Sequence, residues 1–470
     1  MTEVRDYRVG GPESPRAVAR GLANGAWFQA DIAPERLQAL MVRSNRRAAW
    51  DTLLWVGLLV VTGWLAWQVR SGWLAVPAFL LYGGLHGGSA DPRWHECGHG
   101  TAFASGWMNN AVYYPASFMI ARLPTQWRWS HFRHHTDTII VGRDAEILYP
   151  RPPSWRGVFL SFTNWVAGPA AMVGIVQQAV TGTLSDVNQE IVPESDHRRV
   201  ITEARVFTLV WVAVLMACGF TQSLWPVLYV GGPTIYGAWL MVFFGITQHA
   251  GLQEDVLDHR WSTRSVRVNP IFGFLYLNMN WHVEHHMFPA VPYHALPALH
   301  EEIKDQLAPP STSMVHAYRE IFGALRQQRR DPKWELPRDV PDVPGRRRRV
   351  EQAFSWPEVD SVDTWHDLEV PPPVPGQMRA VGDVLLVCVD DGSTHGDLVA
   401  ISRWCTHGDA DLAEGLLMGT EIECPKHNGR FDLRSGQPVR RPVTTPIERW
   451  TVDRSETRVR IQRLRNPDVA

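Results

Sequence analysis

Two long apolar stretches constrain the fold of this chain more than any other feature of its sequence. The first runs from Trp50 to Ala90 and the second from about Val206 to Thr247, and a short polar turn interrupts each near its middle. Because a helix of roughly 20 apolar residues crosses the hydrocarbon core of a bilayer, each stretch is long enough for two spans. The sequence therefore predicts two helical hairpins and about four transmembrane helices. A large soluble core with buried helices is the alternative.

Arginine residues indicate which side of the membrane each loop faces. They gather before the first span, before the third and after the fourth, whereas the two hairpin tips carry only Arg70. Cytoplasmic loops are enriched in arginine and lysine, so we expect both termini and the long middle loop in the cytoplasm, with the protein in a bacterial inner membrane. The first 40 residues contain acidic groups and no apolar core, so no cleavable signal peptide is expected.

Three short runs concentrate histidine near the predicted ends of these spans. The runs "HECGH", "HFRHH" and "HVEHH" space their histidines by i, i+3 or i+4, which places the members of each run on one face of a helix. Buried imidazoles are costly unless a partner satisfies their ring nitrogens, and eight of them exceed what one four-coordinate or six-coordinate ion can use. The pattern therefore indicates two metal ions on the cytoplasmic side. The predicted metal-ligating and catalytic residues of these runs are His95, His99, His131, His134, His135, His282, His285 and His286.

Carboxylates within and beside these runs allow two further interpretations. Glu96 and His99 form a Glu-x-x-His pair, which is typical of soluble carboxylate-bridged di-iron bundles, but the sequence has no matching set of further glutamates. Glu284, Asp137 and Asp144 are either acceptors for the ring N–H groups of ligating histidines or solvated acids.

The role of His86, in "GGLHGG", is open. We favour a hydrogen-bonded structural histidine over a ligand or a substrate-facing group. Haem binding is a third use of histidine, but b haems need histidine pairs matched across facing spans. The histidines of this chain cluster outside the predicted spans, which disfavours a protein devoted to electron transfer alone.

The character of the sequence changes after His300. "HAYREIFGALRQQRRD" predicts a surface helix, and residues 331–352, which are rich in proline and charge, predict a linker. Its run Arg346–Arg349 is either a solvated tether or a contact with anionic lipid headgroups. We thus expect an N-terminal cytoplasmic segment (1–44), a membrane domain (45–330) and, from short β runs with Gly, Pro and Asp turns, an all-β domain (353–470).

The β domain carries a second set of candidate ligands. A Cys-x-His pair and a Cys-x-x-His pair are separated by sixteen residues; they are Cys405, His407, Cys424 and His427. Two cysteines and two histidines can bind zinc, but each pair here mixes both types in turns between strands. This arrangement resembles a Rieske domain, in which cysteines bind one iron and histidines the other iron of a [2Fe-2S] cluster.

The remaining cysteines, Cys97, Cys218 and Cys388, do not lie beside these ligands. We therefore expect no disulfide between the cluster loops, unlike in respiratory-complex Rieske proteins, and the domain resembles a bacterial oxygenase ferredoxin. Such cysteine usage agrees with a reducing cytoplasm.

The three histidine runs around two membrane hairpins resemble the membrane-bound fatty acid desaturase and alkane hydroxylase superfamily. The resemblance covers about residues 45–305 and implies a non-haem di-iron centre that uses O2. It also implies a ninth metal-ligating and catalytic histidine, His249 in "TQHAG". Within the superfamily, "QHAGLQEDVLDHR" and "NMNWHVEHHMFP" are most similar to the rhizopine-catabolism oxygenase branch. A histidine at the start of the third run, His282, distinguishes the chain from front-end desaturases.

The two halves together predict an O2-dependent membrane oxygenase. It hydroxylates or oxidatively dealkylates an unactivated C–H bond with electrons from its Rieske domain, and desaturation of a lipid acyl chain is the alternative. The tether between the halves raises the local concentration of the electron donor. A soluble Rieske oxygenase subunit is disfavoured, because it would place the cluster before the catalytic site.

The expected partners follow from the same features. The chain has no Gly-x-Gly-x-x-Gly dinucleotide motif, so a separate NAD(P)H-dependent ferredoxin reductase is expected. The predicted spans imply contact with membrane lipid and a hydrophobic or amphipathic small-molecule or lipid substrate. A net charge of −2 gives no argument for binding nucleic acid.

Overall fold

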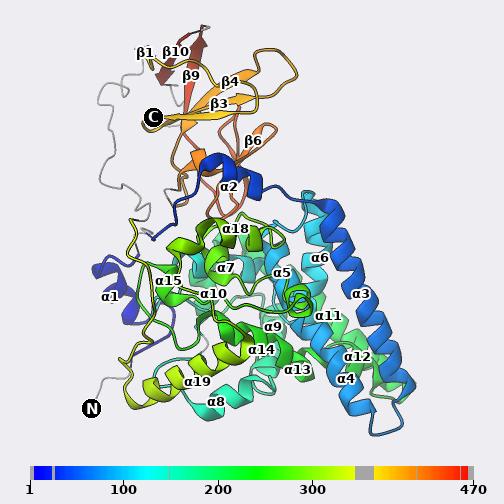
Figure 1. Cartoon of the computed structure of the whole chain (residues 1–470). Coiled ribbons are helices and arrows are strands. Elements are labelled where there is room, and N and C mark those ends of the chain that lie inside the picture. The colour runs from blue at the N-terminus through cyan, green and yellow to red at the C-terminus, as the bar shows by residue number, and fades with distance from the viewer. Residues whose placement is uncertain are drawn as a thin grey trace. The chain divides into compact units, whose positions relative to one another are not determined.

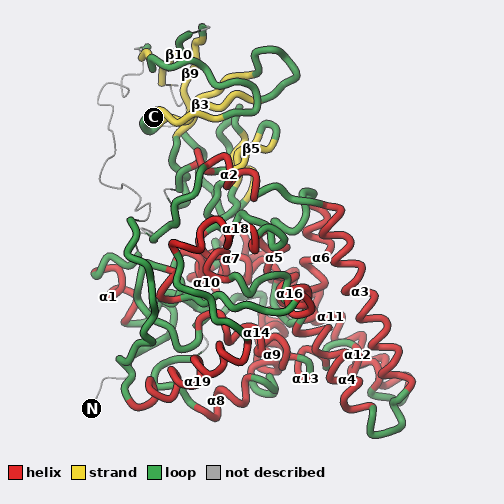
Figure 2. Tube along the Cα trace, in the orientation of Figure 1, coloured by secondary structure: helices red, strands yellow, loops and turns green. Residues whose placement is uncertain are grey.

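The structure is a computed structural model, and it divides the chain into two compact units. It describes residues 5–23, 27–147, 149–344, 365–408, 410–455 and 457–463. One unit comprises Met1–Asp31, Val42–Met287 and Val291–Gly345, and the other comprises Ile32–Met41, Phe288–Ala290 and Arg346–Ala470. The first unit is helical, and the second contains the β-sheets (Figure 1, Figure 2). Residues 345–352 of the predicted linker, with Arg346–Arg349, and residues 353–364 of the predicted β domain lie outside the described residues.

Two helices of the first unit are long and apolar enough to cross a membrane by length and composition. They are α3 (Asn45–Gln68) and α11 (Glu194–Thr221). The Ser44 side chain caps α3 by accepting a hydrogen bond from the Arg47 amide. Many large apolar side chains of both helices are exposed, among them Leu53 and Leu215. Exposed apolar surface of this extent marks a partner or membrane contact.

The returning leg of each predicted hairpin is not one continuous helix. After α3 the chain forms α4 (Ala75–Gly83), a π-helix η1 (Gly84–Gly88) and α5 (Ala90–His99). After α11 it forms α12 (Trp225–Tyr229), α13 (Pro233–Tyr236) and α14 (Ala238–His249). Glycine and proline divide these legs, and a count of apolar residues does not register such breaks. The helical fold of this part is confirmed, whereas four transmembrane helices are not.

Glycines allow the two returning legs to approach each other closely. A Cβ atom at Gly237 would lie 2.0 Å from the Gly83 carbonyl oxygen, and one at Gly88 would lie 2.4 Å from the Leu240 Cβ atom. Only glycine fits such backbone-to-backbone distances. This contact holds α5 and α14, which each end with a histidine, in one part of the unit.

The remaining helices of the first unit surround these legs. Their bounds are α1 (Glu13–Ala19), α6 (Gly106–Met119), α7 (Pro124–Thr136), α8 (Trp155–Ser161), α9 (Ala167–Thr181), α10 (Asp186–Ile191), α15 (His259–Ser262), α16 (Pro270–Leu275), α17 (His282–Met287), α18 (Leu296–Ile303), the 3-10 turn η2 (Lys304–Gln306) and α19 (Met314–Arg330). The last of these is the surface helix predicted from the sequence, and the Ser313 side chain caps it.

The second unit contains two antiparallel sheets. One has the strand order β1-β10-β9-β4-β3-β2, and the other has the order β5-β6-β7-β8. The elements are α2 (Pro34–Leu40), β1 (His366–Asp367), β2 (Met378–Val381), β3 (Val384–Val389), β4 (Asp397–Ser402), η3 (Leu412–Glu414), β5 (Leu416–Met418), β6 (Glu421–Glu423), β7 (Arg430–Asp432), β8 (Pro438–Arg440), β9 (Arg449–Arg454) and β10 (Val459–Arg463). The prediction of a C-terminal β domain is confirmed.

Strand β3 is buried on both faces and lies within the core of this unit. Leu385 and Val387 pack in the apolar cluster that also contains Cys405 and Cys424, whereas Val384 and Leu386 pack in a cluster on the opposite face. Successive side chains of a strand point to opposite faces, which explains this alternation. The first of these two apolar clusters therefore packs directly around the candidate ligands Cys405 and Cys424.

Replacing Gly237 with alanine should destabilise the helical unit. The new Cβ atom would overlap the Gly83 carbonyl oxygen, which is part of the backbone and has no freedom to swing aside. We expect a loss of about 1–3 kcal/mol, measured as a lower thermal midpoint of the purified full chain in detergent. Gly174→Ala in α9 is the matched control, because a Cβ atom there meets nothing within 4 Å. Equal midpoints for the two variants would contradict this account of the contact.

Candidate metal centres

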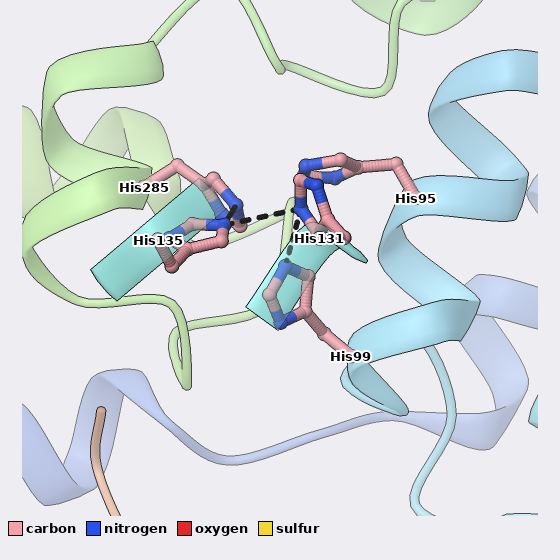
Figure 3. A group of neighbouring side chains, drawn as sticks. All are labelled: His95, His99, His131, His135 and His285. Atoms are coloured by element: carbon pink, nitrogen blue, oxygen red, sulfur yellow. Dashed lines mark hydrogen bonds between the residues drawn. The ribbon is translucent and has the colours of Figure 1, made fainter. Parts of the chain in front are cut away.

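Four helices bring the nine predicted histidines together in the first unit. Helices α5, α7 and α17 carry the three runs, and α14 ends with His249. The side chains form two groups, and the candidate ligand atoms within each group lie within 4.8 Å of one another. One group is His95, His99, His131, His135 and His285, and the other is His134, His249, His282 and His286. Figure 3 shows the side chains of the first group directed toward one another from α5, α7 and α17.

Ring nitrogens within each group face one another at hydrogen-bonding distance. In the first group, His135 Nε2 lies 3.1 Å from His131 Nε2 and 3.2 Å from His285 Nε2. In the second group, His286 Nε2 lies 3.1 Å from His282 Nε2. A neutral imidazole has one N–H group and one lone pair. A hydrogen bond between two facing nitrogens requires an N–H group on one of them, so the facing nitrogens of a group cannot all be paired with each other. A cation between them satisfies all of their lone pairs at once.

Burial keeps most of these imidazoles neutral. The pKa of five rings lies well below the usual value for histidine. Burial is the larger cause, and the neighbouring histidines are the smaller one. These five are His95, His135, His282, His285 and His286. Metal ions bind the neutral form of the ring, which such a low pKa favours at neutral pH.

Several ring nitrogens have no hydrogen-bond partner among the described residues. The buried nitrogens without a partner are both nitrogens of His95, the Nε2 atom of His249 and the Nδ1 atoms of His135, His282 and His285. Leaving a buried polar atom unsatisfied costs about 1–3 kcal/mol. Neutral imidazole is a good ligand for iron, so the set of donors fits a pair of iron ions.

Two carboxylates orient histidine rings from the side opposite the facing nitrogens. His134 Nδ1 donates to Asp144 Oδ2 at 2.9 Å, and His131 Nδ1 lies 3.3 Å from Glu146 Oε1. Asp144 is itself held by the Ile139 amide at 2.7 Å. A carboxylate that accepts the Nδ1 proton fixes the tautomer of the ring and leaves Nε2 available to a metal. Asp144 therefore has the role considered from the sequence, whereas sequence reasoning missed Glu146.

The same carboxylates favour positive charge at the His134 ring. Burial lowers the pKa of His134, but Asp144 and Glu146 outweigh this effect and raise the pKa to about 9. Burial raises the pKa of Glu146, but His131 and His134 outweigh it and lower the pKa to about 2. The positive charge that this environment favours is supplied by either a proton or a metal ion.

The other two acids considered from the sequence contact different partners. Glu284 lies 2.5 Å from His300 Nδ1 and accepts a hydrogen bond from Ser265 at 2.5 Å, so it anchors α17 between two of its histidines. Asp137 pairs with Arg143 at 3.0 Å. Among the described residues, neither carboxylate forms a hydrogen bond with one of the nine rings.

Two further residues, Thr138 and Ser262, contact rings of the second group. Thr138 Oγ1 lies 3.2 Å from His286 Nδ1, and the Ser262 carbonyl oxygen lies 2.9 Å from His249 Nδ1. The sequence does not show which backbone carbonyl lies beside a ring, and no sequence feature singled out Thr138. His86 is buried in η1 and belongs to neither group.

A cavity of about 210 Å³ adjoins both histidine groups. It reaches two histidines of the first group and three of the second: His95, His131, His134, His249 and His282. Its wall combines apolar side chains such as Met241 and Trp127 with charged ones such as Asp91 and Arg122. A cavity next to both groups is where a substrate would meet them.

The second unit holds its candidate ligands in two similar loops. Cys405 follows β4, and its amide donates to the Ala410 carbonyl at 2.9 Å. Cys424 follows β6, and its amide donates to the Gly429 carbonyl at 2.8 Å. In each loop, the cysteine amide is thus hydrogen-bonded to the carbonyl of the residue five positions later. The Cys405 thiol is hydrogen-bonded to Cys424, and this contact and burial raise its pKa.

The histidines of these loops also meet. His407 Nδ1 lies 3.2 Å from His427 Nδ1, with His427 buried and His407 exposed. All five cysteines of the chain are free in the structure. The paired sulfur atoms and paired Nδ1 atoms fit a cluster that needs two ligands of each type.

Comparison with protein families identifies both parts of the chain. Residues 71–318 match the model of the fatty acid desaturase family. The chain belongs to this family. Residues 361–451 match the Rieske [2Fe-2S] domain. The Rieske domain carries a [2Fe-2S] cluster, and the desaturase domain implies a di-iron centre, which the histidine groups fit. Both resemblances noted in the sequence are confirmed, while the branch within the desaturase family stays a prediction.

Several relatives match the Rieske domain. The ferredoxin component of the naphthalene 1,2-dioxygenase system of Pseudomonas putida is 41% identical over 85 residues, which are 17% of this chain and 82% of that protein. The ferredoxin component of the 2,4-dinitrotoluene dioxygenase system of Burkholderia sp. (strain RASC) is 37% identical over 86 residues, 18% of this chain and 77% of that protein. Among solved structures, the ferredoxin of carbazole 1,9a-dioxygenase from Nocardioides aromaticivorans IC177 is 32% identical and covers 20% of this chain and 99% of its own, with a TM-score of 0.17.

Replacing Asp144 with asparagine in the desaturase domain should weaken iron binding by about 10–100-fold, because the His134 ring loses its charged acceptor. The measurement is the iron retained by the full chain after a chelator challenge, with the absorbance of the Rieske cluster as internal standard. Asp137→Asn is the matched control, since Asp137 pairs with arginine and should leave iron retention unchanged. Equal retention in wild type and Asp144→Asn would contradict the role of this carboxylate.

Proposed function

We propose that this chain is an O2-dependent membrane oxygenase that hydroxylates or oxidatively dealkylates an unactivated C–H bond. The observation that carries the proposal is the pair of histidine groups beside one cavity, in a desaturase domain fused to an electron-transfer domain. In the overall reaction, one oxygen atom of O2 enters the C–H bond and the other leaves as water, with two electrons and two protons consumed.

The two histidine groups are the proposed ligands of the two iron ions. These ions, when bound, supply the reductive activation of O2. The protein positions the rings: Asp144 and Glu146 hold the Nδ1 protons of His134 and His131, so that the Nε2 lone pairs are available. Burial of the rings keeps water away from the site.

The Rieske domain is the proposed source of the electrons. Cys405, Cys424, His407 and His427 are its proposed cluster ligands. Because His407 is exposed, it offers the edge of the cluster to an external electron carrier. The relatives are ferredoxin components of dioxygenase systems, which supports a separate NAD(P)H-dependent ferredoxin reductase as the partner.

The membrane arrangement belongs to the same proposal. Two apolar helices support association with a membrane, and we propose four spans with both iron sites and both termini in the cytoplasm of a bacterial cell. The proposed divisions of the chain are 1–44, 45–330, 331–352 and 353–470. Desaturation of a lipid acyl chain is the second candidate, favoured by the match to the fatty acid desaturase family.

His407→Ala removes a proposed cluster ligand and should abolish reductase-driven O2 consumption by membranes that contain the protein, although the histidine groups are untouched. Adding the isolated wild-type domain, residues 350–470, should restore part of the activity at a rate that rises with its concentration, because a free donor lacks the high effective concentration of a tethered one. His395→Ala, an exposed histidine of the same unit outside the cluster loops, is the control and should behave as wild type. Full activity of His407→Ala without added domain would mean that the Rieske domain is not the donor.

A further inference from the structure

We propose that Asp255 is a positioning residue for the second histidine group, and that an N-terminal strap holds Asp255 in place. The strap consists of residues 5–23, 27 and 28. It lies outside residues 71–318, which match the fatty acid desaturase family. The role of Asp255 does not depend on the proposed reaction, because bound iron, and no product, is what reports on it.

Asp255 joins the loops that follow two histidine-bearing helices. It comes six residues after His249, the last residue of α14, and it contacts the loop that follows α7. The Asp255 amide donates to the Ile139 carbonyl at 3.1 Å, and its Oδ1 atom accepts a hydrogen bond from the Val141 amide at 2.9 Å. Ile139 and Val141 are buried, and buried backbone groups in a loop need such partners. Asp255 therefore ties the two loops together.

The contacts of Asp255 continue to a ring of the second group. Ile139 is bound to Asp255 through its carbonyl, and its amide donates to Asp144 Oδ2 at 2.7 Å. The same Asp144 oxygen accepts a hydrogen bond from His134 Nδ1 at 2.9 Å. Because Ile139 is held at both of its backbone groups, a displacement of Asp255 moves the amide that holds Asp144. Asp255 therefore acts on the His134 ring through these two residues.

Two arginines of the strap balance the charge of Asp255. Its Oδ2 atom pairs with Arg20 at 2.9 Å and also with Arg5. Arg5 further pairs with Glu254 at 3.2 Å, and the Tyr7 hydroxyl donates to Glu254 at 2.8 Å. The Asp255 side chain is 5% exposed, and a carboxylate so deeply buried requires opposite charge nearby. The strap therefore supplies the charge that the buried Asp255 needs.

Backbone contacts keep the strap against the same two loops. The Gly10 amide donates to the Gly142 carbonyl at 3.0 Å, and the Phe28 amide donates to the Leu257 carbonyl at 2.9 Å. A Cβ atom at Gly142 would lie 2.7 Å from the Ser14 amide nitrogen, so this approach of two backbones requires glycine. The strap thus packs on the loop after α7 and on the loop after α14 at the same time.

The residues held in this way also border the cavity beside the histidine groups. Ile139 and Glu254 line it, together with Arg151, which pairs with Glu254 at 3.2 Å. The Arg151 amide in turn donates to the Tyr7 hydroxyl at 3.1 Å. This part of the cavity wall therefore depends on the strap as well.

The first experiment measures iron binding by Asp255→Asn in the full chain. Asparagine adopts left-handed backbone as readily as aspartate, so the φ of 58° at this position is preserved. We expect the histidine groups to bind iron about tenfold more weakly in a chelator challenge, with the Rieske absorbance as internal standard. Asp6→Asn is the matched control, because Asp6 pairs with the exposed Arg8 of the same strap. Unchanged iron binding by Asp255→Asn would overturn the proposal.

A double variant separates positioning from a general loss of stability. Because Asp255 acts through Asp144, Asp144→Asn combined with Asp255→Asn should bind iron no more weakly than Asp144→Asn alone. A residue that merely stabilises the fold would add its own effect to that of Asp144→Asn. Fold-losses in iron binding that multiply in the double variant would therefore overturn the positioning role.

A further variant reaches the same contact without altering residue 255, so the proposal stays testable where Asp255→Asn does not fold. Arg5→Met with Arg20→Met removes both cations that pair with Asp255 and should weaken iron binding about as much as Asp255→Asn. Arg8→Met with Arg16→Met is the matched control, because it removes the same number of cations from the strap, and these pair with other acids. Equal iron binding by the two arginine variants would overturn the role of the strap.

Discussion

Buried ring nitrogens without a hydrogen-bond partner among the described residues, on five of the nine clustered imidazoles, are the constraint on which the desaturase domain depends. Each buried polar atom without a partner costs about 1–3 kcal/mol, and several ring nitrogens are in this state among the described residues. A bound ion removes this cost only at the ring nitrogens that face it. The packing of the domain serves this arrangement: the Gly83–Gly237 contact holds the returning legs together, and Asp144 orients one of the rings.

The fusion of the two domains follows from the chemistry of the first. Reduction of O2 at an iron pair consumes two external electrons in each turnover, and a Rieske cluster delivers them one at a time. Covalent attachment replaces a collision between two proteins by an intramolecular event. The buried His427 and the exposed His407 give the cluster one protected side and one side open to a donor or acceptor.

Side-chain spacing made most of the candidate site predictable. Histidines at i, i+3 and i+4 identify three ligand-bearing helices without any knowledge of the fold, and paired Cys and His residues identify the Rieske loops in the same way. Spacing does not show which acid reaches a ring. Asp144 and Asp137 looked equivalent in the sequence, but the turn after α7 directs Asp144 to His134, while Asp137 meets arginine. Glu146 was missed for the same reason, since it lies on a loop.

The apolar helices show the opposite limit of sequence-based prediction. The two apolar stretches predicted four apolar legs, but two of these legs are divided by glycine and proline into shorter helices. Glycines at these breaks let the two legs approach each other at Gly83 and Gly237. The local sequence contains these residues, yet their effect depends on contacts between segments about 150 residues apart.

Mössbauer spectroscopy of the full chain purified from cells grown on ⁵⁷Fe tests the central claim most directly. The account predicts about four iron atoms per chain, with half of the signal from the [2Fe-2S] cluster and half from a non-haem pair in a nitrogen-rich environment. A spectrum that contains only the cluster signal, with zinc or no metal bound to the histidine groups, would contradict it.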